Sequence, residues 1–215
     1  MAREKGITIP FEQLLQGLSR TFFLLPAFLS LVLGCSACGI FEPRDPDPPA
    51  QSGSNYIPPT EPSLVFTNMV NAFRDMNAVN YVRSFADIAT AGRNYIFEPT
   101  SEARQRYSVF TEWTRESEQK YFESMKSRVL SGAFPALELG EPVALSIQSD
   151  SAQYEVTYRL NVPHGQTNIP TQAQGRAVFY MIADNSRNWV IWRWVDIAQA
   201  QDDFTWSDFK GQFGQ

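Results

Sequence analysis

The chain has 215 residues, 18 basic and 23 acidic side chains, and a formal net charge of −5, with no long run of either sign. Binding to nucleic acid calls for a basic face of clustered lysine and arginine, so this composition excludes nucleic acid as the expected partner. The two cysteines are Cys35 and Cys38. The chain beyond them has no cysteine for an internal disulfide and must be stabilised by packing.

A basic leader and a short apolar run open the chain. Arg3, Lys5 and Arg20 precede the uncharged stretch 21–34, which ends in Val-Leu-Gly before Cys35. A run of about 14 residues is too short for a membrane span and has the length of a signal-peptide core. The pattern resembles bacterial lipoprotein signal peptides, in which cleavage precedes a diacylated cysteine. We therefore expect a signal peptide over 1–34 and an acylated, palmitate-type lipid anchor at Cys35.

Two alternatives accompany this prediction. Cys38 fits the cleavage pattern less well, because the residue three positions before it is Cys35 rather than a branched aliphatic one. An uncleaved signal anchor is the other alternative, and Pro26 and the short run count against it. Ser36, where an aspartate would favour the inner membrane, indicates lipid anchoring in the bacterial cell envelope on the periplasmic side of the outer membrane.

The next segment, 35–62, is rich in Pro, Asp, Ser and Gly and poor in aliphatic residues. Such a segment buries too little apolar surface to offset the entropy lost on ordering, so it is expected to be a disordered tether. One folded domain is expected over 63–200, followed by a C-terminal segment, 201–215, that packs on or beyond a sheet.

Helices are expected first in this domain. Apolar residues recur at three- and four-residue spacing from Ser63 to Phe73 and again from about Asn77 to Gly92, which predicts a helical hairpin. A short strand over 95–99 ends at Pro99. A third amphipathic helix is expected between Phe110 and Leu130.

From Pro142 onward the apolar period changes from helical to alternating. The pattern predicts four antiparallel strands, over 143–147, 154–162, 175–184 and 189–197, joined by turn-forming segments.

This order of elements carries a family resemblance. A helical hairpin ending in Phe85-Ala86-Asp87, a short Phe97-Glu98-Pro99 strand and the tryptophan-rich strand 188–196 resemble the nuclear-transport-factor-2-like superfamily, which includes ketosteroid isomerases and polyketide cyclases. The resemblance implies an α+β cone of three N-terminal helices packed on a curved antiparallel sheet, with a pocket at its open end. It implies little about activity, because this fold hosts many functions.

Two carboxylates are candidate general bases. The resemblance places Asp87 at a helix end and Glu98 on the following strand, where the isomerase base lies, and Tyr95, Tyr158 or Arg193 could then polarise a carbonyl group in the same pocket. Lone carboxylates at element ends are more often structural, so the sequence predicts no catalytic residue.

His164 is the single histidine and is expected in an exposed loop. One histidine without domain cysteines makes no zinc site, so neither a metal nor a cofactor is expected. Nucleophile and phosphate-loop motifs are also absent from the sequence.

Large aromatic side chains are concentrated in the last strand. Trp189, Trp192 and Trp194 lie within six residues, and strict alternation would leave some of them on the outer face of the sheet as a contact surface. The resemblance also implies pairing through this face. We expect a homodimer or an envelope protein as partner, with a small apolar ligand as a further candidate.

The preferred interpretation is a membrane-tethered envelope lipoprotein with a noncatalytic binding or interaction domain. The alternative is a pocket enzyme of the isomerase, dehydratase or cyclase type with Glu98 or Asp87 as general base. A passive spacer, with a cone filled by side chains, is a third possibility.

Overall fold

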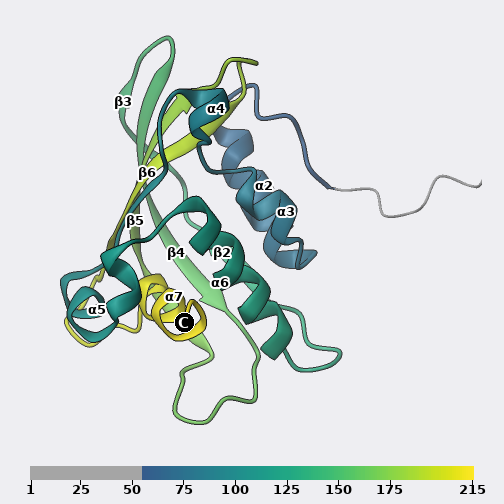
Figure 1. Cartoon of the computed structure of the whole chain (residues 1–215), viewed down its shortest axis with the longest axis vertical. Coiled ribbons are helices and arrows are strands. Elements are labelled where there is room, and N and C mark those ends of the chain that lie inside the picture. The colour runs from purple at the N-terminus through teal and green to yellow at the C-terminus, as the bar shows by residue number, and fades with distance from the viewer. Residues whose placement is uncertain (1–54) are drawn as a thin grey trace, which may run out of the picture. The chain divides into compact units, whose positions relative to one another are not determined.

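The structure, a computed structural model, describes residues 55–215 (Figure 1). The predicted signal peptide, Cys35 and the tether up to residue 54 lie outside the described residues. Gly53–Gln215 forms a compact unit by its own contacts, and the apolar core of the described residues lies within it. This segment therefore has what it needs to fold alone.

The first helix follows its apolar period. Helix α2 (Pro62–Arg74) begins with proline in its first turn and buries one face, made of Val65, Phe66, Met69, Ala72 and Phe73. The chain before it is already held on the domain. The side-chain amide of Asn68 pairs with both backbone groups of Ile57, at 2.6 and 2.8 Å, and Trp189 N donates to Pro59 O at 2.7 Å. Residues 57 and 59, which belong to the expected tether, are thus held on the domain.

The second helix of the expected hairpin is broken in two, α3 (Ala78–Val82) and α4 (Ile88–Ala91). Between them the backbone joins the last strand: Ala86 N donates to Ile191 O, and Ile191 N donates to Ser84 O, each at 2.8 Å. The Asp87 side chain then accepts from Ala89 N and caps α4, which ends at Gly92 with φ 65°. Sheet pairing outweighs the helical period here.

Strand β1 (Ile96–Glu98) lies where expected, and two short elements follow it that the apolar pattern did not predict, α5 (Ser101–Arg106) and η2 (Ser108–Thr111). Helix α6 (Arg115–Arg128) is the predicted third helix and starts at Thr114 with a capping box to Ser117.

One sheet holds all six strands. Strands β2 (Ala136–Leu139) and β3 (Val143–Ile147) both pair with β4 (Ser151–Asn161), which is followed by β5 (Gln172–Ala183) and β6 (Trp189–Ile197). The path is β1-β6-β5-β4-β2, antiparallel except for the parallel pair β1–β6. The four long strands are those predicted, while β2 was missed. Its alternation spans only four residues.

Helices cover one face of this sheet (Figure 1). The C-terminal segment forms helix α7 (Trp206–Phe213), which packs against β5, α5 and α6. It fills the inner side of the sheet and leaves the outer face open. Among residues 55–215, none of the helices has both the length and the apolar character needed to cross a bilayer.

Candidate functional site

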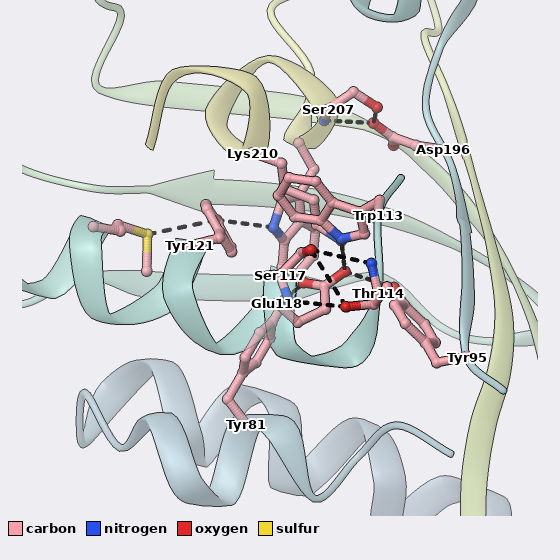
Figure 2. Close-up of polar contacts among 12 residues, drawn as sticks. Tyr81, Tyr95, Trp113, Thr114, Ser117, Glu118, Tyr121, Asp196, Ser207 and Lys210 are labelled. Atoms are coloured by element: carbon pink, nitrogen blue, oxygen red, sulfur yellow. Dashed lines mark hydrogen bonds and ion pairs between the residues drawn. The ribbon is translucent and has the colours of Figure 1, made fainter. Parts of the chain in front are cut away.

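A buried ion pair lies at the centre of the helical layer (Figure 2). Glu118 of α6 and Lys210 of α7 are both fully buried, and Lys210 Nζ lies 2.5 Å from Glu118 Oε1. Pairing of this kind is what a charge in the interior requires, because an unpaired buried charge is strongly unfavourable.

The Glu118 carboxylate accepts three further hydrogen bonds. Tyr95 Oη at 2.6 Å and Trp113 Nε1 at 2.8 Å donate to Oε1, and Tyr81 Oη at 2.9 Å donates to Oε2. Burial, with the Glu118 charge adding to it, raises the pKa of both tyrosines well above 10. The two hydroxyls therefore remain protonated donors, and the carboxylate is saturated by protein groups.

Lys210 is enclosed by aromatic rings. Its Nζ lies 3.5 Å from the ring centre of Trp194 and 3.6 Å from that of Phe97, which are cation–π distances. Burial lowers the pKa of Lys210 to about 8, and the Glu118 carboxylate opposes that shift.

A second buried carboxylate fastens α7 to the sheet. Asp196 of β6 accepts from Ser207 N and Oγ at 2.7 and 2.5 Å, as Figure 2 shows in part, and from Tyr158 Oη at 2.7 Å. Burial raises the pKa of Asp196, while these hydrogen bonds and Lys210 act against it. Tyr158 Oη in turn accepts from Trp206 N at 2.9 Å. Trp206 Nε1 donates a further hydrogen bond to Tyr121 Oη on α6 at 3.1 Å.

The candidate pocket residues fall into separate groups. Tyr95 and Tyr158 point inward but bond to Glu118 and Asp196 respectively. Glu98 accepts from Arg193 Nε at 2.7 Å, with both side chains about one third exposed on the outer side of the sheet. That bond raises the pKa of Arg193.

Asp87 is the helix cap described above and also pairs with Arg115 at 3.4 Å. It lies beside a surface cavity of about 250 Å³, which Tyr95 and Arg115 also line. The structure therefore does not gather the five expected residues into one pocket.

Trp189 and Trp194 are both buried, although strict alternation would put them on opposite faces of the strand, which corrects the expected alternation. Tyr180 pairs with Arg193 and Met181 pairs with Ile191, so Trp192 is the extra residue of a β-bulge. The extra residue changes which face of the sheet the side chains on either side of it occupy. Trp194 is fully buried against Trp206 and Trp189 is buried beside Pro59, whereas Trp192 is half-buried on the outer face.

On the outer face, two aromatic rings lie between two arginine side chains. The Arg93 guanidinium lies 4.8 Å from the Trp192 ring centre, Trp192 packs edge-on against Tyr180, and Arg193 lies 4.8 Å from the Tyr180 ring centre. We call these four residues the outer-face cluster. Tryptophan, tyrosine and arginine are the residue types enriched where proteins bind one another.

His164 is buried rather than exposed, which corrects the expectation for this loop. Its Nε2 donates to Pro170 O at 3.1 Å and its Nδ1 accepts from Gln166 N at 3.2 Å, an arrangement that requires the neutral ring protonated on Nε2. Within residues 55–215, the His, Asp and Glu side chains form no group of three or more that could hold a metal ion.

The buried charges that sequence reasoning missed are Glu118 and Lys210. In the sequence, both resemble solvent-exposed charges on a helix. Glu118 lies among the charges of α6, and Lys210 lies near the C-terminus. The capping box of Thr205 and Asp208, with Trp206, Phe209 and Phe213 at helical spacing, was the available signal for α7.

Comparisons with known proteins give likenesses to solved structures alone. No protein-family model matches the chain, and no curated protein matches it. Solved structures do match, and they include nuclear-transport-factor-2-like and ketosteroid-isomerase-like proteins, with TM-scores below 0.5.

Three of the matching structures illustrate the likeness. A nuclear-transport-factor-2-like superfamily protein from Salmonella enterica is 8% identical, with a TM-score of 0.47 over 64% of this chain and 88% of that one. A ketosteroid-isomerase-like protein from Erwinia carotovora is 13% identical, with a TM-score of 0.44 over 64% and 93%. A conserved protein from Planctomyces limnophilus is 13% identical, with a TM-score of 0.47 over 62% and 89%. These likenesses concern the fold and leave the activity open.

Proposed function

We propose that this chain is a membrane-tethered lipoprotein of the bacterial cell envelope whose folded domain binds a partner and carries out no reaction. The observation that carries the proposal is the filled interior of the cone. Helix α7 places Trp206, Phe209 and Lys210 among the rings of the core, and each is fully buried. Neither Glu118 nor Lys210 lines any of the four cavities described on this domain.

An isomerase or cyclase would need a base that reaches a substrate in a closed apolar pocket. The two carboxylates first considered for that role are otherwise engaged, Glu98 with Arg193 on the outer face and Asp87 as a helix cap. Glu118 is enclosed, and its oxygens already accept four hydrogen bonds from protein groups. These engagements favour the noncatalytic interpretation over the enzyme hypothesis.

The outer-face cluster is the surface that this proposal assigns to binding. It combines half-buried aromatic rings with arginines and faces away from the helical layer. A second copy of the chain or an envelope protein would cover it. Attachment to the membrane rests on the sequence around Cys35, and mass spectrometry of the native N-terminus tests it: a mature chain that starts elsewhere, or that carries no lipid, contradicts the tether.

An interior ligand is tested with the indole N–H signals of residues 53–215 in nitrogen-15 correlation spectra. Addition of steroids, naphthols and naphthoquinones should leave the signals of Trp113, Trp194 and Trp206 in place, because the interior has no room. A saturable shift of these three signals would support the pocket enzyme instead.

Binding is tested in cells with a photocrosslinking residue at position 192 and, as a matched control, at Val79, which is exposed on α3. A discrete crosslinked product is expected at position 192 alone. Asp87→Asn should leave its yield unchanged, since asparagine retains the helix cap. Glu98→Gln should also leave it unchanged, since glutamine still offers an oxygen to Arg193 Nε of the outer-face cluster. Loss of the product in either variant, with an unchanged melting temperature, would restore a functional role for that carboxylate.

A further inference from the structure

Two loops lie side by side at one end of the domain. The loop after α6, 129–135, and the loop between β4 and β5, 162–171, form the lower end in Figure 1. Val129 and His164 make an antiparallel bridge, and Leu130 N donates to Pro163 O at 3.0 Å. We call these two segments the loop pair.

The loop pair exposes large apolar side chains, and hydrogen bonds hold the loops that carry them. Phe134 is 78% exposed, more than any other large apolar residue described, and Leu130 is 52% exposed. Gly132, at φ 77°, turns the backbone just before Phe134, and Pro135 just after it is buried. The buried His164 ring holds the neighbouring loop at both of its nitrogens. Phe134 is therefore presented outward by an ordered turn.

The loop pair carries no acidic side chain and adjoins a basic helix end. Segments 129–135 and 162–171 contain no acidic residue, although the whole chain is acidic, and the last turn of α6 supplies Lys126 and Arg128. On the adjoining elements, Glu138 pairs with Arg159, whereas Glu123 accepts from the uncharged amide of Gln119 and keeps its charge. Exposed phenylalanine and leucine beside basic side chains are the composition of a surface that enters the interface of an anionic bilayer.

The opposite end of the domain differs in charge. Strand β3 also exposes apolar side chains, including Ile147, but Glu141 precedes it and Asp150 lies in the turn that follows. Acidic groups at that end disfavour an anionic lipid surface.

We propose that the loop pair docks on an anionic lipid bilayer, with Phe134 and Leu130 entering the headgroup region and Lys126 and Arg128 facing the lipid phosphates. The proposal rests on the proposed function in one respect: the lipid anchor would keep the domain close to the membrane. Residues 36–54 span at most about 65 Å when fully extended, so a chain anchored at Cys35 would hold the loop pair near the membrane. Docking of this end would leave the outer-face cluster free for a protein partner.

The test uses residues 53–215, which carry the whole core and lack Cys35, in co-flotation with vesicles at several millimolar lipid. Binding is expected to vesicles of phosphatidylethanolamine with 30% phosphatidylglycerol, to fall at least tenfold in Phe134→Asp, and to fall about fivefold in Lys126→Glu. Phe134→Leu should retain most of it. Ile147→Asp, a matched change at an exposed apolar residue of the opposite end, should bind within twofold of the parent.

No binding by the parent domain, unchanged binding in Phe134→Asp, or an equal loss in Ile147→Asp would each overturn the proposal. Binding to vesicles of phosphatidylcholine equal to that with phosphatidylglycerol would also overturn it. The tether is measured separately on the native N-terminus. An unlipidated chain whose domain still binds these vesicles refutes the tether and keeps the docking surface, and a lipidated chain whose domain does not bind refutes only the docking surface.

Discussion

Lys210 and Glu118 form a buried pair that stabilises the domain only as a pair. Each charge alone would be left in an interior without solvent, and removing one partner of such a pair typically costs about 3–5 kcal/mol. The rings of Phe97 and Trp194 around the ammonium, and the three hydroxyl and indole donors on the carboxylate, complete the set of partners. At the scale of single residues this is the feature with the largest energetic consequence.

The Lys210 ammonium predicts a pH dependence of stability. Its pKa is about 8 in the fold and 10.5 in an unperturbed lysine, so between these values the unfolded chain binds a proton that the folded chain has released. The free energy of unfolding should therefore rise with pH, by up to about 1.4 kcal/mol per unit from this group. Above pH 10 the buried tyrosines act in the opposite direction, since their pKa values are raised in the fold.

Urea denaturation at pH 7.5, 8.5 and 9.5 measures this slope. The comparison is the double variant Glu118→Gln with Lys210→Met, which removes both charges and leaves neither unpaired. The wild type should gain stability with pH relative to the double variant, and equal slopes would contradict the lowered pKa of Lys210.

At the scale of elements, the side chains of helix α7 fill the inside of the cone. Its capping box and the rings of Trp206, Phe209 and Phe213 form the local helix and its apolar stripe. Close approach to the loop before η2 requires Gly211. A Cβ atom at this position would lie 2.2 Å from the Tyr107 ring.

Gly211→Ala should therefore destabilise the domain by about 1–3 kcal/mol, the usual cost of overpacking, although alanine favours a helix over glycine by about 1 kcal/mol. Chemical denaturation measures the change. Tyr107→Ala in the same chain vacates the space, so the two changes together should cost less than the sum of their separate effects. A stabilised Gly211→Ala variant would mean that α7 does not pack this closely.

For the molecule as a whole, the outer face of the sheet is electrically balanced. Glu98 pairs with Arg193, Glu155 with Arg176 and Glu138 with Arg159, in a chain whose net charge is −5. Two acidic molecules can meet through such a face without like charges opposed. Covering a few hundred Å² of apolar surface on each copy offers several kcal/mol at about 25 cal/mol per Å², before association costs are subtracted.

We therefore expect residues 53–215 to self-associate weakly through the outer-face cluster. Light scattering at tens of micromolar should detect dimers, and Trp192→Asp should shift the sample to monomers without lowering the melting temperature by more than a few degrees. Ile147→Asp is the control and should leave the dimer intact. A strictly monomeric parent would leave an envelope protein as the partner for this face.

Much of the architecture follows from periodicity and composition. The change from a helical to an alternating period placed α2, α6 and the four long strands, because the apolar face of each element is continuous over several turns or pleats. The predicted α+β cone is confirmed. The expected leader rests on the length of the apolar run before Cys35, and the expected tether rests on the proline-rich stretch after it. Both stay predictions.

Long-range contacts decided the rest. Pairing of the 84–86 backbone with Ile191 broke a helix that local spacing predicted as one. The bulge at Trp192 left both Trp189 and Trp194 buried, although strict alternation assigns them to opposite faces. Glu118 and Lys210 lie 92 residues apart, and each alone has the sequence signature of a solvated charge. A charge becomes an interior group only when tertiary packing supplies its partner, and no local pattern of residues records where that partner lies.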